Sequence, residues 1–241
     1  MDWSTILVAA ILFAAAFLQS ATGFGLALVC MALIPLLVPV GDAIAYVAIA
    51  SLVVNCFIIF ANRAGLSFKN ALPLVIGMCL GIPIGYYGLR SMDGELIVRL
   101  LGVALMLIAV AEFLQKRFAR FAIPEKAGGP LSFVGGILAG AFNVGGPPVV
   151  VYAYSRDWSK VEIVAILQTV FVAGALTRNG LMIREGEYTA DLLKLVGWSL
   201  PGAAIAVWLG KLTLDRLPQL LLKRVVFALI FALGLKYLVT G

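Results

Sequence analysis

The side chains that most enzymes use for catalysis are missing from the apolar parts of this sequence. The chain has no histidine, and no Asp or Glu stands at the centre of an apolar stretch. Cys30, Cys56 and Cys79 all lie within apolar stretches, where free cysteine packs as a small residue, and their odd number argues against a disulfide framework. Neither a metal site nor an acid–base pair can be assembled. We therefore expect no enzyme activity, no metal and no cofactor.

A glycine- and proline-rich interruption offers a different chemistry. The stretch "GAFNVGGPPVVVYAY" (140–154) has apolar sequence on both sides. The prolines that begin at Pro147 fit the first turn of a new helix, where a missing N–H costs nothing. The side chain of Asn143, just upstream, can reach the exposed amides, and Gly145 and Gly146 leave the backbone open to a ligand.

A second interruption, "QSATGFGLAL" (19–28), predicts another helix that begins at Leu26. A helix N-terminus carries about half a positive charge, and its amides and dipole together bind anions. Two such ends that meet in the middle of the membrane would form an anion site. The residues that we expect this interruption to contribute are Gln19, Ser20, Thr22, Gly23, Phe24 and Gly25.

Polar side chains within the apolar stretches are further candidates, because a charge there indicates a functional site by default. Arg178 could contact the anion or could extend to the membrane surface. Gln168 could bind a substrate oxygen or make an ordinary bond between helices. The same two alternatives hold for Ser51 and Asn55, which lie four residues apart on one helical face.

The composition requires a membrane around these elements. Of 241 residues, 63% are hydrophobic and 12% are charged, and the mean hydropathy is +1.08. A soluble domain carries about a quarter charged residues, so much of the surface must face lipid. The formal net charge of +6 lies in the loops, where it sets topology and does not indicate binding to nucleic acid. The partners that we expect are the lipid bilayer and a small anion, and a homo-oligomer is compatible with the sequence.

The order of elements repeats. Each half has an interrupted stretch followed by three apolar spans, and "FANRAGLSF" (60–68) occupies the same place as "LMIREGEYT" (181–189). Two similar halves are common among transporters. We predict an all-α membrane protein with a first repeat at 1–115, a cytoplasmic linker at 116–130 and a second repeat at 131–241.

The distribution of positive charge predicts how the interrupted stretches sit. If each enters and leaves on one side, twelve of the 18 Lys and Arg residues fall on one face and six on the other. If each crosses once, the split is ten against eight. The positive-inside rule therefore favours re-entrant hairpins and places both termini in the periplasm. Three net crossings per half would make the halves inverted repeats.

The two interruptions, each leading its half of the chain, resemble those of the TauE/SafE family of sulfite and organosulfonate exporters. The resemblance covers nearly the whole chain, although the first break has GFG where many relatives have GGG. It implies a multi-pass protein of the bacterial inner (cell) membrane that carries small sulfur oxyanions or sulfonates.

These observations predict a secondary transporter that exports a small sulfur-containing anion, bound between the N-termini of two broken helices. An anion channel and a non-transporting scaffold subunit are the alternatives. The absence of a central carboxylate or histidine fits export, because a membrane potential that is negative inside drives an anion outward with about 2.3 kcal/mol per charge per 100 mV.

The charge distribution gives a first testable prediction. A topology reporter fused after Gly241 should report the periplasm, and reporters inserted near Arg120 or Arg156 should report the cytoplasm. A cytoplasmic C-terminus would contradict the hairpins and the inverted repeat together.

Overall fold

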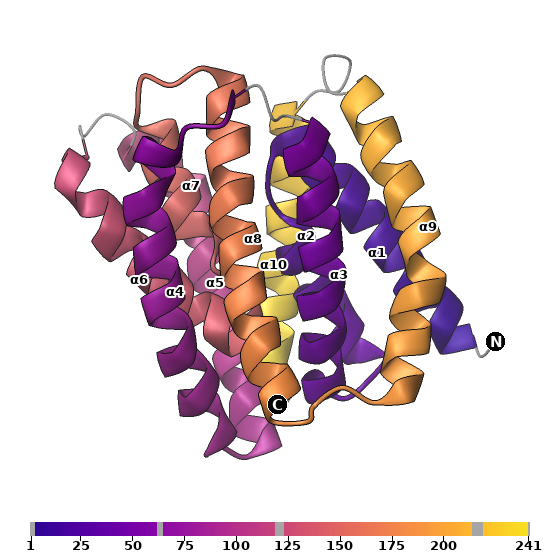
Figure 1. Cartoon of the computed structure of the whole chain (residues 1–241). Coiled ribbons are helices and arrows are strands. Elements are labelled where there is room, and N and C mark those ends of the chain that lie inside the picture. Colours follow the sequence, from indigo (N-terminus) through magenta and orange to yellow (C-terminus); the bar gives the residue numbers. More distant parts are fainter. Residues whose placement is uncertain (1–2, 62–64, 119–122, 214–218, 241) are drawn as a thin grey trace.

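The structure of the chain is a computed structural model that describes residues 3–61, 65–118, 123–213 and 219–240. Within these ranges it is helical and contains no strand (Figure 1). Its α-helices are α1 (Trp3–Thr22), α2 (Leu26–Leu33), α3 (Val40–Ala61), α4 (Phe68–Arg90), α5 (Gly94–Phe118), α6 (Gly128–Phe142), α7 (Gly146–Tyr154), α8 (Lys160–Arg184), α9 (Ala190–Thr213) and α10 (Gln219–Thr240). The short 3-10 helices η1 (Ile34–Leu36) and η3 (Glu125–Ala127) precede α3 and α6.

Helix length and composition identify a multi-pass membrane protein. In the described part of the chain, five helices are long and apolar enough to cross a bilayer, namely α3, α4, α5, α8 and α9. Helix α10 has 22 residues, which at 1.5 Å per residue also matches the roughly 30 Å hydrocarbon core. Helices α2 and α7 have only 8 and 9 residues, so neither can cross alone.

Both predicted interruptions separate two helices, and backbone conformation explains each break. At the first, Gly23 and Gly25 have φ angles of 83° and 115°, which glycine adopts without the steric cost that a Cβ would bring. At the second, Asn143 has a φ of 62°, and Asn is one of the few other residues that tolerate this region. Two prolines then stand in the first turn of α7, as the sequence predicts.

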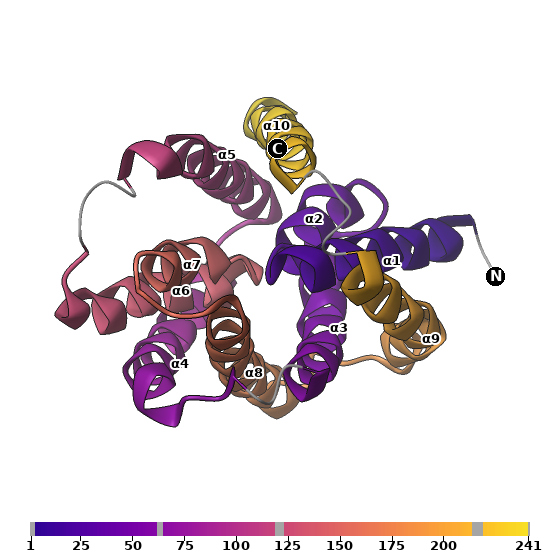
Figure 2. The same cartoon turned by 90° about the horizontal axis from the view of Figure 1, so that it is seen from above.

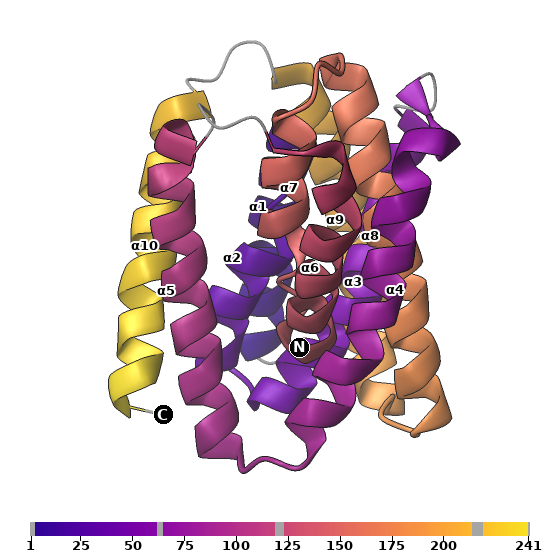
Figure 3. The ribbon, with the colours of Figure 1, turned by 90° about the vertical axis from the view of Figure 1, so that its left-hand side faces the viewer.

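Each broken pair of helices begins and ends at one end of the bundle. Helices α1 and α3 both start toward the lower end in Figure 1, and α6 and α8 both start toward the upper end. The α4–α5 and α8–α9 connections lie at the lower end, toward which α10 also ends (Figure 3). The start of α1 and the end of α10 therefore lie toward the same side of the molecule.

The two halves of the sequence exchange helices. Helix α4 of the first half packs against α6 and α8 of the second, and α9 of the second half packs against α1 and α3 of the first (Figure 2). Helices α3 and α8 pack together at the centre, and α5 packs along α10. Helix α5 continues to Phe118 and α6 begins at Gly128, so regular helix reaches into the expected linker at 116–130.

The closest packing is that of α4 on α6, and glycines make it possible. A Cβ at Gly77, Gly81 or Gly85 of α4 would overlap with backbone atoms of α6. In the opposite direction, a Cβ at Gly136 or Gly140 would overlap with the backbone of α4. Small residues let membrane helices approach closely enough for dispersion forces to hold them together. Ser132 of α6 adds a buried hydrogen bond, which its hydroxyl donates to the carbonyl of Leu74.

This contact predicts opposite effects for two glycines on one helix. Gly85→Ala should lower the free energy of unfolding by about 1–3 kcal/mol, because the added methyl group meets the backbone of α6. Gly88→Ala is the matched control, because a Cβ there meets nothing within 4 Å and alanine favours the helix. Melting temperatures of the purified variants in detergent would test this, and equal values would show that the helices can separate at no cost.

Candidate functional site

Both breaks line one cavity, at the meeting point of helices from the two halves. The cavity has a volume of about 70 Å³. The predicted site residues that line it are Gln19, Phe24, Gly25, Asn143, Gly145, Gly146 and Arg178. The other lining residues are Ala27, Leu28, Ser51, Asn55, Met78, Ala139, Val144, Phe171, Gly174 and Ala175.

Side-chain amides satisfy the backbone at the first break. The amide N–H of Leu26, the first residue of α2, donates to Oε1 of Gln19 at 3.0 Å. Nε2 of Gln168, from α8, donates to the carbonyl of Gly23 at 2.9 Å. The two glutamines also meet, with Nε2 of Gln19 donating to Oε1 of Gln168 at 3.4 Å. Gln168 does not line the cavity, and it stabilises the break through its hydrogen bond to Gly23.

At the second break, Asn143 does not cap α7, and this expectation was wrong. Asn143 instead ends α6 in a left-handed conformation, and its Nδ2 donates to the carbonyl of Ile44 in α3 at 2.8 Å. No side chain caps the start of α7. The left-handed turn directs the asparagine away from the helix that follows, which sequence proximity does not reveal.

The two helix N-termini present different sets of amides to the cavity. The first intrahelical bond of α2 runs from Val29 to Gly25, so the N–H groups of Ala27 and Leu28 have no acceptor within the helix. In α7, Pro147 and the next proline have no N–H, which leaves the amide of Gly146 as the donor of that first turn. The first break is therefore the richer source of backbone donors.

Arg178 of α8 is held inside the protein and does not extend to the membrane surface. Its side chain is 3% exposed, and its Nη1 donates to the carbonyls of Ala139 and Gly140 in the last turn of α6. The C-terminal dipole of α6 favours a cation at this position. Nε of Arg178 has no hydrogen-bond partner, and none of the ion pairs between described residues includes this guanidinium.

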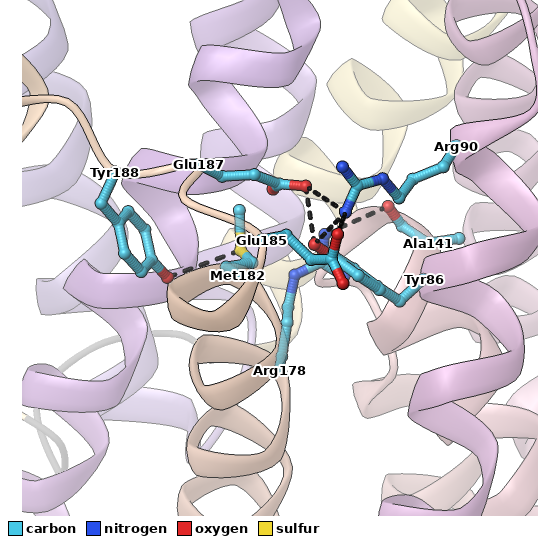
Figure 4. A network of polar contacts seen from close by, with 8 residues as sticks. All are labelled: Tyr86, Arg90, Ala141, Arg178, Met182, Glu185, Glu187 and Tyr188. Atoms are coloured by element: carbon cyan, nitrogen blue, oxygen red, sulfur yellow. Dashed lines mark hydrogen bonds and ion pairs between the residues drawn. The ribbon is translucent and has the colours of Figure 1, made fainter.

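Beside Arg178, a polar network fastens the end of α4 to the α8–α9 connection (Figure 4). Nη1 of Arg90 lies 2.9 Å from a carboxylate oxygen of Glu185 and 3.3 Å from one of Glu187. The hydroxyl of Tyr86 donates to Glu187 at 2.6 Å and accepts from Arg90 at 3.0 Å. The guanidinium of Arg178 lies 5.9 Å from the centre of the Tyr86 ring. The network therefore joins the two halves of the chain next to the buried cation.

Tyr188 continues this contact toward α3. Its hydroxyl donates to Oδ1 of Asn179, and Nδ2 of Asn179 donates to the carbonyl of Ala48 in α3 at 3.0 Å. Burial raises the pKa of Tyr188 to about 12, so this hydroxyl stays protonated and remains a donor at physiological pH. Sequence reasoning did not identify the network, because Arg90 ends α4 and the two glutamates follow α8, about 95 residues later in the chain, with no shared pattern.

Four predicted site residues besides Gln168 do not line the cavity. Ser20 donates to the carbonyl of Val207 in α9 at 2.7 Å, which fastens α1 to its neighbour. Thr22 donates within the break, to the carbonyls of Leu18 and Phe24. Gly23 forms the turn, and Pro147 forms the start of α7 behind the lining residues. These residues shape the breaks without facing the cavity.

Part of the apolar lining comes from residues that the sequence did not single out. Phe171 and Gly174 of α8 and Met78 of α4 contribute to the wall, and Phe171 lies opposite Gly146, where a Cβ would be 3.5 Å from its ring. Only the three-dimensional exchange of helices brings Met78 here. Gly25 also lines the cavity, but its φ of 115° would strain any larger residue there, whatever the ligand.

The chain is similar to known membrane proteins. Residues 7–237 match the family described as "Sulfite exporter TauE/SafE". A protein of Cupriavidus necator, named "Probable sulfite/organosulfonate exporter TauE", is 24% identical over 234 residues, which cover 93% of this chain and 90% of that protein. No solved structure matches the chain.

The contacts of Arg178 predict a graded loss of stability. Arg178→Gln should lower the free energy of unfolding without any anion by about 1.5–3 kcal/mol, the range for hydrogen bonds to a charged group. Arg178→Lys should cost less, because it keeps the charge near the α6 carbonyls but loses the planar fork. Arg184→Gln, at the exposed end of the same helix, is the control, with a change near zero. Arg178→Gln at wild-type stability would contradict these contacts.

Proposed function

This chain belongs to the TauE/SafE family of sulfite exporters, and on that premise we propose that it is a secondary transporter that exports a small sulfur-containing anion. Sulfite or an organosulfonate is the proposed substrate, bound between the N-termini of α2 and α7. The printed name of the Cupriavidus necator relative, a probable sulfite/organosulfonate exporter, supports this substrate class.

The cavity itself is the observation that carries the proposal. Arg178 is the one ionisable side chain among its described lining residues. The N-termini of α2 and α7 add positive partial charge and amide donors, and the C-terminus of α6 offsets part of the charge of Arg178. A buried cation without a paired carboxylate is costly, and an anionic ligand in the cavity would lower that cost.

The size of the cavity supports a small ligand. A buried water needs roughly 10–15 Å³ of the space open to its centre, so a volume of about 70 Å³ holds on the order of five water-sized groups. Sulfite or a short sulfonate has a comparable number of heavy atoms. The aromatic and aliphatic walls from Phe24, Phe171, Leu28 and Met78 lower the local dielectric constant, which strengthens the electrostatic attraction of the site for an anion.

We further propose that the halves are inverted repeats, with α1 to α5 equivalent to α6 to α10. Exchange of the halves turns the α4–α6 contact into the α9–α1 contact, and the α4–α8 contact into the α9–α3 contact. The α3–α8 and α5–α10 contacts turn into themselves. The start of α1 and the end of α10 lie toward one side, which supports the prediction that both termini lie on the same side of the membrane. The positive-inside rule assigns that side to the periplasm of a bacterial inner membrane.

The test is anion binding and flux with the purified protein. Sulfite or an organosulfonate should raise the melting temperature, in a screen with sulfite, thiosulfate, sulfate, sulfoacetate and taurine. In liposomes, flux of the stabilising anion should follow the membrane potential. If no anion in the screen stabilises the protein or crosses the membrane, the proposal is wrong.

A glycine pair provides the matched variants for this test. Gly146→Leu should weaken anion binding at least tenfold, because its side chain would fill the space between the α7 amide and Phe171. Gly180→Leu, at an exposed position of α8 where a Cβ meets nothing within 4 Å, should bind as the wild type does. Calorimetry would measure the anion affinity of both variants. An unchanged affinity of Gly146→Leu would show that α7 does not contribute to the site.

A further inference from the structure

Asn55 of α3 is a polar lining residue whose role the sequence left open. It lies 4% exposed in the interior and faces the cavity between the two breaks. An amide side chain buried this deeply must satisfy an acceptor and a two-hydrogen donor. The contacts of each group decide which end of the amide faces the cavity.

The orientation of Asn55 follows from a chain of amides anchored on backbone atoms. The N–H of Leu26 can only donate, so the group of Gln19 that receives it is the oxygen, Oε1. The carbonyl of Gly23 can only accept, so the group of Gln168 that contacts it is the nitrogen, Nε2. With both glutamines fixed in this way, Nε2 of Gln19 faces Gln168 and Asn55 and donates to Oε1 of Gln168 and Oδ1 of Asn55. The atom of Asn55 that faces Gln19 is therefore its oxygen.

In this row of hydrogen-bonded amides, the oxygen of Asn55 has a partner and its nitrogen does not. Oδ1 of Asn55 accepts from Gln19, whereas Nδ2 has no acceptor among the hydrogen bonds of the described residues. An acceptor atom of a ligand in the cavity, which Asn55 lines, would pair this donor.

We propose that Nδ2 of Asn55 donates a hydrogen bond to an oxygen of the bound anion. This assignment rests on the proposed function and adds a neutral donor from α3 to the charge of Arg178 and the amides of the two helix ends. It also defines the ligand chemistry at this place. The group that meets Asn55 must be a hydrogen-bond acceptor, such as a sulfite or sulfonate oxygen, and an ammonium group there would face a donor.

The hydrogen bonds of Gln19 also couple the position of Asn55 to the conformation of the first break. Gln19 bonds to Leu26 at the start of α2 and to Asn55 at the same time. Movement of the break would therefore change the position of the donor that meets the anion. Substrate contact and the geometry of the break are joined through a single side chain.

Asn55→Asp tests the assignment with little change of shape. An aspartate at this position can still accept from Gln19, so the observed contact is kept, and only the nitrogen is replaced by an oxygen. With methanesulfonate as the probe, binding by calorimetry should be at least tenfold weaker than that of the wild type, because a charge-assisted hydrogen bond is lost and a negative charge is added.

Asn55→Leu is the second variant, in case the buried aspartate prevents folding. It should also bind methanesulfonate at least tenfold more weakly. Ser132→Ala is the control, because it removes a buried hydrogen bond between α4 and α6, and neither Ser132 nor its partner Leu74 lines the cavity. It should lower the melting temperature without changing the affinity for the anion.

The outcomes separate this inference from the proposed function. If the wild type binds methanesulfonate and either Asn55 variant binds it with unchanged affinity, the assignment of Asn55 is overturned while the transporter proposal stands. If the wild type binds neither methanesulfonate nor any anion of the screen, the proposed function itself fails and this assignment fails with it.

Discussion

Interrupted backbone must find hydrogen-bond partners inside a membrane, because lipid supplies none. The two breaks of this protein meet that requirement in different ways. At the first, Gln19 and Gln168 pair with the backbone of Leu26 and Gly23. At the second, Arg178 pairs with the last carbonyls of α6, and prolines remove N–H groups that would otherwise be exposed. A neutral pair of amides holds one break and a cation holds the other.

The polar groups that hold the breaks also give the cavity its chemistry. Arg178 and Gln19 both line it, and neither is fully used by the backbone it supports. Nε of Arg178 has no partner, and Gln19 orients Asn55 through its second bond. If the cavity binds the proposed anion, folding and anion binding depend on the same side chains. A substitution at either residue would then act on both, and measurements with and without an anion would separate the two effects.

Local features of the structure were predictable from the sequence, and contacts between distant helices were not. Glycine and proline at 23–25 and 145–148 identified both breaks, because few other residues tolerate those conformations. The buried position of Gln168 followed from its place in an apolar stretch, whereas the sequence left open whether Arg178 would be buried or extend to the membrane surface. The contact of Asn143 with Ile44 depends on a left-handed turn, and the position of Met78 in the cavity wall depends on the exchange of α4. Neither leaves a periodic signal in the sequence.

The exchange of α4 and α9 between the halves has a consequence for how the protein is made. Helix α4 enters the bilayer during synthesis before α6 and α8 exist. Its glycine face, at Gly77, Gly81 and Gly85, fits the backbone of α6 and has no such surface to meet until the second half follows. Helices α1 and α3 likewise lack their packing partner α9 until the second half is synthesised. Neither bundle can be completed from its own half, so the cavity, which Arg178 of α8 lines, can form only after much of the second half has been synthesised.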